Sequence, residues 1–159
     1  MKKSNEKHKG EPKRVDNRRA RYDYAFDDTF EAGMVLFGSE VKSLYHGKAN
    51  LTDSYCQIKN NELWVLNVDI EPYDKATVFQ HERRRERKLL MHRKEIDVLH
   101  RKSQEKGFSI IPMAMYFKNG KAKLQVGLGR GKANYDKRDS IAKAETKREQ
   151  DRIRAGKYQ

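Results

Sequence analysis

The chain has 159 residues, of which 36 are Lys or Arg and 23 are Asp or Glu, so its formal net charge at pH 7 is +13. This length accommodates one domain with terminal extensions, and a charged fraction of 37% is too polar for every residue to lie in one packed body. The sequence has no apolar run long enough to span a bilayer, no apolar segment of a secretory signal and a single cysteine, Cys56, so we expect a reducing, cytoplasmic location without an internal disulfide.

The positive charge is concentrated in separate blocks. Residues 1–21, 82–102 and 130–159 each carry a clear excess of Lys and Arg, whereas residues 22–81 carry more Asp and Glu than Lys and Arg. Basic blocks around a mildly acidic segment favour a specific polyanionic partner over uniform coating of DNA, because the carboxylates would repel phosphates over any face they occupy.

The first 16 residues contain almost no apolar side chains, which predicts a disordered basic arm ahead of a domain over residues 17–131. From Tyr22, aromatic residues near every second position predict a strand that reaches Phe30. Residues 38–44 (GSEVKSL) are expected to form a glycine turn followed by a short strand.

Two β-type runs, residues 55–58 and 63–70, flank an Asn-Asn pair. Asparagine tolerates positive φ, so Asn60 and Asn61 predict a hairpin between these runs. Residues 93–106 follow with apolar side chains at helical spacing, which predicts the one inserted helix.

The last part of the domain predicts a second hairpin. Residues 108–117 form an apolar run in which Pro112 indicates an edge or a bulge, and Asn119–Gly120 is a strong hairpin turn. Residues 121–128 alternate between apolar and polar, so one face of this strand is core and the other presents Lys121 and Lys123. About six short strands and one helix predict a mainly β fold, a small antiparallel barrel of the oligonucleotide-binding type.

Residues 132–159 form a basic tail with few large apolar residues. Its charges lie three and four residues apart, which favours a solvated helix with too little to bury to be stable alone. We expect this tail to be disordered when free and helical when bound.

The sequence contains no convincing catalytic or metal site. None of the histidines is spaced from another histidine or from Cys56 as zinc ligands are. Residues 127–132 resemble a phosphate-binding loop, but one residue is missing before Gly-Lys and Ala133 stands where a hydroxyl would hold Mg²⁺. Asp27 and Asp53 are equally explained by a turn and a helix cap. We therefore expect neither an enzyme nor a cofactor.

Arginine-rich clusters favour RNA binding. Residues 17–21 and 83–88 contain more Arg than Lys, which suits bidentate contact with phosphate and stacking on bases. Tyr24 and nearby tyrosines have either a stacking role or a place in the barrel core. Glu40 beside Lys42 is suited to accept from the amino groups of bases, or else forms an ion pair within the sheet.

A set of motifs in one order resembles a single known family. The motifs are NRRARY at 17–22, EAG at 31–33, GSEVKSL at 38–44, DSY at 53–55, RKLL at 87–90, KG at 106–107, YF at 116–117, RGK at 130–132 and YDKR at 135–138. Over residues 14–154 this combination resembles the bacterial SsrA-binding protein (SmpB) family.

The resemblance implies an oligonucleotide-binding barrel that binds the tRNA-like domain of transfer-messenger RNA (tmRNA). Such a protein brings alanylated tmRNA, with elongation factor Tu, to stalled ribosomes for trans-translation, in which the stalled peptide is tagged and the ribosome is rescued. Elongation factor Tu and alanyl-tRNA synthetase would be indirect partners through tmRNA. The tail would occupy the empty mRNA channel at the decoding centre.

The resemblance also assigns roles to individual residues. Asn17, Glu31 and Met91 match positions that contact the elbow of the RNA, where Met91 replaces the usual and nearly isosteric leucine. Together with the charge pattern and the motifs, this gives a set of predicted RNA-binding residues: Asn17, Arg19, Arg21, Tyr24, Glu31, Gly33, Glu40, Lys42, Arg87, Lys88, Met91 and Lys123.

In the tail, Asp136, Lys137 and Arg138 match the motif needed for tagging. Tyr135 stands where some members have histidine, and Thr146 replaces an aromatic residue found in some members. The predicted ribosome-binding residues of the tail are Lys132, Tyr135, Asp136, Lys137, Arg138 and Ile153.

Two other functions remain open on composition. A structural or assembly protein bound permanently to ribosomal RNA would carry similar basic tails. A general single-strand-binding barrel fits less well, because residues 22–81 are acidic.

Overall fold

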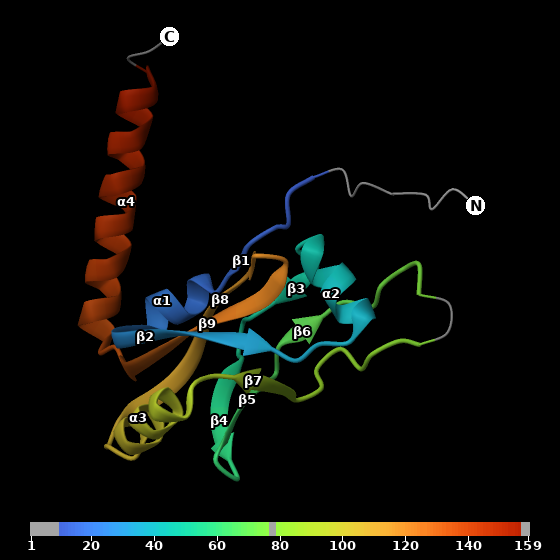
Figure 1. Ribbon diagram of the computed structural model, residues 1–159. Coiled ribbons are helices and arrows are strands. Elements are labelled where there is room, and N and C mark those ends of the chain that lie inside the picture. Colours follow the sequence, from blue (N-terminus) through green and yellow to red (C-terminus); the bar gives the residue numbers. More distant parts are fainter. Residues whose placement is uncertain (1–9, 77–78, 157–159) are drawn as a thin grey trace.

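The computed structural model describes residues 10–76 and 79–156 of the chain (Figure 1). The elements in chain order are β1 (Val15–Asp16), α1 (Arg18–Asp23), β2 (Tyr24–Met34), α2 (Gly38–Tyr45), β3 (Ala49–Asn50), β4 (Tyr55–Lys59), β5 (Glu62–Leu66), β6 (Asp69–Ile70), β7 (Arg87–Leu90), α3 (Arg93–Ser103), β8 (Phe108–Lys118), β9 (Lys121–Gly131) and α4 (Asn134–Gly156).

The fold is mainly β. Seven strands form one antiparallel sheet in the order β1-β8-β9-β2-β7-β5-β4, and β3 pairs with β6 in a separate ladder. The sheet curls so that β4 approaches β8, but no ladder joins its two edges within residues 10–76 and 79–156. The predicted closed barrel of the oligonucleotide-binding type is therefore not confirmed.

Both predicted hairpins are confirmed. Asn60 and Asn61 have φ of 50° and 62°, and Asn119 and Gly120 have φ of 52° and 74°, as the tight turns between twisted strands require. The predicted irregularity at Pro112 is also present, because the β8–β9 register shifts between Pro112 and Ala114.

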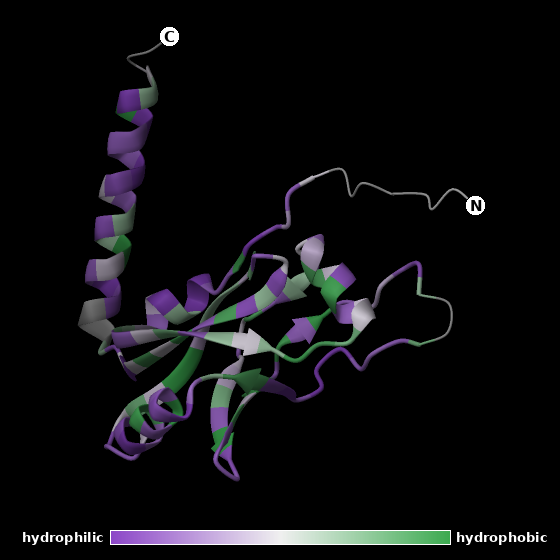
Figure 2. Ribbon diagram, viewed as in Figure 1, coloured by the Kyte–Doolittle hydropathy of each residue, from purple (hydrophilic) through white to green (hydrophobic). Residues whose placement is uncertain are grey.

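The hydrophobic core lies inside the curled sheet. It contains fully buried side chains from β5, β8 and β9, such as Leu63, Met115 and Leu124, and α3 adds Leu99. Each such side chain stabilises the fold by about 1.5–3 kcal/mol relative to leaving it exposed. The hydropathy colouring shows the contrast between the mixed body and the largely hydrophilic α4 (Figure 2).

Part of the predicted arm is ordered against the body. Residues 15–16 form β1 and pair with β8, with Val15 opposite Met115. The backbone N–H of Lys13 donates to the carbonyl oxygen of Tyr45 at 3.1 Å, so this stretch runs along the body. The first nine residues of the predicted arm lie outside the described residues.

The segment before β2 is a short helix rather than the start of a strand. Asn17 caps α1, since its Oδ1 accepts from the backbone N–H of Ala20 at 3.1 Å. The strand therefore begins at Tyr24 instead of Tyr22.

The GSEVKSL segment is helix α2, which corrects the prediction of a short strand. The side chain of Glu40 accepts from the backbone N–H of Phe37 at 2.9 Å and so stabilises the first turn. Glu40, Ser43 and Leu44 are buried at helical spacing. This helical spacing was not recognisable in the sequence, because two of the three buried residues are polar.

The tail is a continuous helix, α4, of 23 residues and about 34 Å in length. Its base contacts α1: Lys137 Nζ lies 3.4 Å from Asp23 Oδ1, and Lys132 Nζ donates to the carbonyl oxygen of Arg21 at 3.1 Å. Every residue from 141 to 156 is exposed, and α4 projects from the body (Figure 1). The predicted helix is confirmed, and its dependence on a partner stays a prediction. Among the helices described here, none is sufficiently long and apolar to cross a bilayer.

Candidate nucleic-acid interface

One face of the sheet carries polar side chains on three neighbouring strands. The register places Glu31 of β2 opposite Gln125 of β9, and Tyr116 of β8 opposite Lys123 of β9. Directly paired residues point to the same side of a sheet, so these side chains share one face, opposite the buried Leu124. We name Tyr116, Lys118, Lys121 and Lys123, with Arg14 beside them, the cationic sheet face.

Glu31 is held within this face by its neighbours. The hydroxyl of Tyr116 donates to Glu31 Oε2, and Lys118 Nζ lies 3.5 Å from Oε1. The hydrogen bond from Tyr116, aided by Lys118 and Lys123, lowers the pKa of Glu31. Burial and the same contact raise the pKa of Tyr116 to about 12. The carboxylate is therefore an ionised acceptor among cations, with its position set by a neutral phenol.

Arg14 extends the face across β8. Its guanidinium carbon lies 5.1 Å from the ring centroid of Tyr116, and its Nη2 lies 3.5 Å from Gln125 Oε1. Arg14 Nε also pairs with Asp16 at 3.0 Å. Guanidinium and ammonium groups in such a row are suited to phosphate oxygens, and the Glu31 carboxylate is suited to amino or hydroxyl hydrogens.

A hollow of about 500 Å³ adjoins the cationic sheet face. Four predicted binding residues come together in it, and we name it the Met91 hollow; its lining is Glu31, Gly33, Leu90, Met91, His92, Glu95 and Lys123. The β2–β7 ladder forms its floor by pairing Gly33 with Leu90, whose side chain is 55% exposed. The apolar floor can hold a ribose or a base against Leu90, while Lys123 on the polar rim contacts a phosphate.

Glu40 and Arg87 do not reach the surface, which corrects the prediction that they contact RNA. Both are fully buried, and Arg87 Nε donates to Glu40 Oε2. Arg87 Nη1 donates to the carbonyl oxygen of Val68 at 2.8 Å, and Arg85 Nε donates to Glu40 Oε1 at 3.0 Å. We name Glu40, Arg85 and Arg87 the buried charge cluster.

The charges of this cluster are set by burial and by pairing. Burial disfavours the charge of Glu40, but hydrogen bonds from Arg85, the Phe37 backbone and Arg87 outweigh it and leave its pKa below the usual value. Burial lowers the pKa of Arg87, and the pairing with Glu40 opposes that effect. The cluster ties α2 to β7 rather than serving a ligand.

Asn17 is mostly internal, and its contact with RNA stays a prediction. Its side chain is 4% exposed, and its Nδ2 donates to the carbonyl oxygens of Leu51 at 3.3 Å and Pro112 at 2.8 Å. With its Oδ1 engaged by Ala20, the amide has no donor left for a ligand.

The other predicted RNA contacts are dispersed. Lys42 Nζ lies 5.2 Å from the ring centroid of Tyr73, and Lys88 pairs with Glu62 at 2.9 Å. Arg21 lies 3.9 Å from a carboxylate oxygen of Asp16. None of these three arginine and lysine side chains lines the Met91 hollow.

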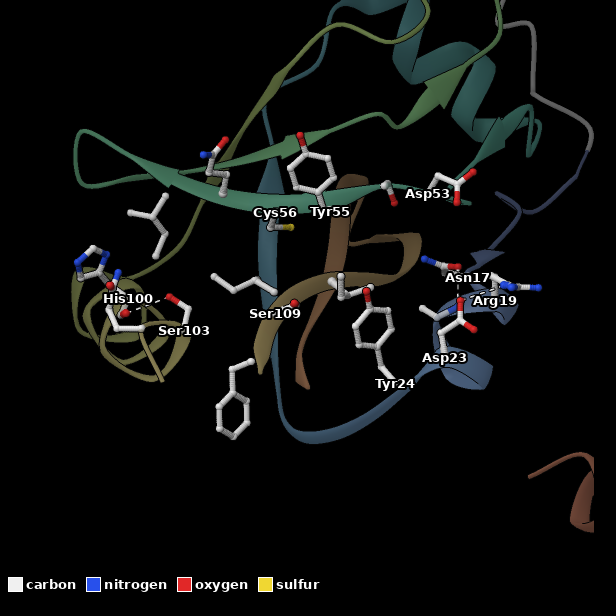
Figure 3. Close-up of a pocket in the computed structure, with 18 residues that line it drawn as sticks. Asn17, Arg19, Asp23, Tyr24, Asp53, Tyr55, Cys56, His100, Ser103 and Ser109 are labelled. Carbon is white, nitrogen blue, oxygen red and sulfur yellow. Dashed lines mark hydrogen bonds and ion pairs between the residues drawn. The ribbon is translucent and has the colours of Figure 1, made fainter. Parts of the chain in front are cut away.

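Asn17, Arg19 and Tyr24 line a second cavity of about 670 Å³ between α1, β4, α3 and β8 (Figure 3). Arg19 Nε pairs there with Asp23 at 2.9 Å. The view also labels Tyr55 and His100 around this space. Sequence reasoning missed it, because its walls come from four distant parts of the chain and no motif joins them. Within the described residues, no three His, Cys, Asp or Glu side chains gather as a metal site.

The predicted tail residues lie along α4 and just before it. Lys132 Nζ donates to Ser140 Oγ at 2.7 Å, Arg138 is exposed, and Ile153 is 57% exposed. The side chains of Tyr135 and Asp136 lie outside the part of the chain that the structure describes.

Comparisons with known proteins agree with one another. A family model for the SmpB protein matches residues 14–156. The SsrA-binding protein of Thermobifida fusca is 50% identical over 151 residues, covering 95% of this chain and 94% of that protein. The SsrA-binding protein of Myxococcus xanthus is 54% identical over 138 residues, covering 87% and 85%. A solved structure described as "tmRNA-SmpB: a journey to the center of the bacterial ribosome" is 40% identical, with a TM-score of 0.65, and covers 80% of this chain and 94% of that one.

Proposed function

Because the chain belongs to the SmpB family of SsrA-binding proteins, we propose that it binds the tRNA-like domain of tmRNA and delivers tmRNA to stalled ribosomes for peptide tagging and rescue. It does this in the cytoplasm, where ribosomes translate, as a binding adaptor rather than an enzyme. Elongation factor Tu and alanyl-tRNA synthetase are linked to it only through the RNA.

The observation that carries the proposal is the convergence at the Met91 hollow. Glu31, Gly33, Met91 and Lys123 come from three separate parts of the chain and line one space. The cationic sheet face continues from it and supplies phosphate contacts, so one folded RNA can bind across both surfaces. The exposed length of α4 then remains available to the ribosome, and we assign Lys137, Arg138 and Ile153 to contacts in the mRNA channel.

The test is binding of a fluorescent tRNA-like fragment of tmRNA, measured by anisotropy at several salt concentrations. Lys123→Ala removes a cation from the hollow, and Lys106→Ala removes an exposed cation beyond α3, so the two variants have the same net charge. We expect Lys123→Ala to weaken binding about 5-fold, the equivalent of about 1 kcal/mol, and to make the salt slope shallower by about one.

Lys106→Ala should leave both quantities near their wild-type values. Equal losses in the two variants would mean that net charge alone drives binding and would reject the interface. Stoichiometric presence of the protein in every ribosomal subunit, stalled or not, would instead favour the structural or assembly role.

A further inference from the structure

Two aromatic rings lie exposed beside the arginine-rich segment before β7, and the proposed function does not use them. Phe37 precedes α2 and is 45% exposed, whereas Phe79 lies between β6 and β7 and is 56% exposed. Their ring centroids are 5.1 Å apart at an interplanar angle of 72°. The fold thus brings together two large apolar rings that are 42 positions apart in the sequence and leaves both partly open to solvent.

The buried charge cluster supports this aromatic pair from one side. The guanidinium carbon of Arg85 lies 4.2 Å from the ring centroid of Phe37. Arg85 is itself held by Glu40, and its Nη2 lies 3.4 Å from the carbonyl oxygen of Val35. The orientation of Phe37 is therefore set before any ligand arrives, which lowers the ordering cost of stacking against it.

The charge beside the pair favours a nucleic acid over a neutral apolar partner. Arg83 pairs with Asp69 at 2.9 Å. Arg84 is exposed and directly precedes Arg85, which contacts Phe37. The charge of Arg84, after that of Arg83, helps to lower the pKa of Asp69. An aromatic surface in contact with Arg85, one residue along the chain from the exposed guanidinium of Arg84, offers both contacts that an unpaired nucleotide needs, a π face for the base and a cation for its phosphate.

The aromatic pair is also within reach of the proposed RNA interface. Phe37 follows Gly33 of the Met91 hollow by four residues, which span at most about 14 Å even when fully extended. We propose that Phe37 and Phe79 form a stacking site for an unpaired base of the bound RNA, with Arg84 contacting the adjoining phosphate. This inference rests on the proposed function for its RNA ligand.

The test compares two fluorescent ten-nucleotide probes that carry the same phosphates, an oligoadenylate and an RNA with abasic positions at its centre. Binding to the full-length protein is measured by anisotropy at low salt. The double variant F37L/F79L keeps apolar bulk but removes both π faces, and Tyr55→Leu removes an aromatic residue that is 41% exposed on β4 as the matched control.

We expect the wild type and Tyr55→Leu to prefer oligoadenylate by about 5- to 150-fold, the range expected for stacking one base. F37L/F79L should bind both probes with the affinity that the wild type has for the abasic probe, and Arg84→Ala should weaken both probes alike. Tyr55→Leu and Arg84→Ala should unfold at the wild-type temperature, whereas F37L/F79L should melt a few degrees lower but stay folded, because it loses the Arg85 contact and the ring pair.

Retention of the base preference by F37L/F79L would overturn the stacking site. Equal binding of the two probes by the wild type would also overturn it, and that result is expected if these rings bind a protein instead of a base. Failure of the proposed function is separate: the tRNA-like fragment would then bind without dependence on Lys123 while oligoadenylate still required the two phenylalanines.

Discussion

The buried charge cluster makes a strong prediction about stability. Glu40→Gln keeps the size of the side chain but leaves the fully buried guanidinium of Arg87 without a counter-charge. Breaking one partner of a buried ion pair costs about 3–5 kcal/mol, because the remaining charge loses its compensation but not its burial. For a domain of this size we expect a fall in the melting temperature on the order of 10–20 °C.

The assays are thermal unfolding and urea unfolding, both followed by circular dichroism, with Glu62→Gln as the control. Glu62 pairs with Lys88 at 2.9 Å, but both side chains are around 40% exposed. Removing that exposed charge pair should cost less than about 1 kcal/mol. If Glu40→Gln and Glu62→Gln unfold at the same urea concentration, the cluster is not a stabilising element and the reasoning fails.

The pH dependence gives a second readout of the same variant. The pKa of Glu40 is lower in the folded chain than its ordinary value of 4.5. Its contribution to stability is therefore complete above pH 4.5 and is lost as the pH falls through the folded-state pKa. Glu40→Gln should consequently lose less stability than the wild type between neutral pH and acidic pH.

The remaining predictions concern the sheet and the tail. Gly127→Ala should destabilise the fold by about 1–3 kcal/mol in the same urea titration, because a Cβ there would lie 2.5 Å from Phe26 Cδ1 and 2.7 Å from Met113 Sδ. The control Gly131→Ala should unfold like the wild type, since a Cβ at position 131 would have no neighbouring atom within 4 Å. Removal of the chain beyond Ser140 should leave the affinity for the tRNA-like fragment within about 3-fold but abolish peptide tagging in a reconstituted translation assay, since the deleted part of α4 is wholly exposed and none of it lines the Met91 hollow. Loss of fragment binding would contradict this division.

Local signals in the sequence were sufficient for some elements of the fold. Asn60–Asn61 and Asn119–Gly120 specify their turns through positive φ, which few other residues adopt at low cost, so the hairpins needed no knowledge of the rest of the chain. Helix α3 was equally legible, because its two buried residues, Ile96 and Leu99, are apolar and lie three positions apart.

Other elements depend on partners that are distant in the sequence. Glu40 can be buried because Arg85 and Arg87 neutralise its charge. A charged residue on the inner face of a short helix interrupts the apolar three- and four-residue spacing by which α2 would be recognised in the sequence. Asn17 shows the same limit, since two of the three hydrogen bonds of its side chain reach Leu51 and Pro112. For the candidate site, the sequence predicted which residues take part but not that they lie together. The family pattern selected Glu31 and Met91, and it is the pairing of β2 with β7 that makes them neighbours.

The attachment of α4 has a mechanical consequence. A stiff rod of about 34 Å that is gripped only near its root turns small angular changes into large displacements, so a tilt of 10° would sweep its far end through about 6 Å. The contacts of Lys137 with Asp23 and of Lys132 with Arg21 and Ser140 therefore form the hinge of this helix, so a ligand that displaces α1 also moves the far end of α4.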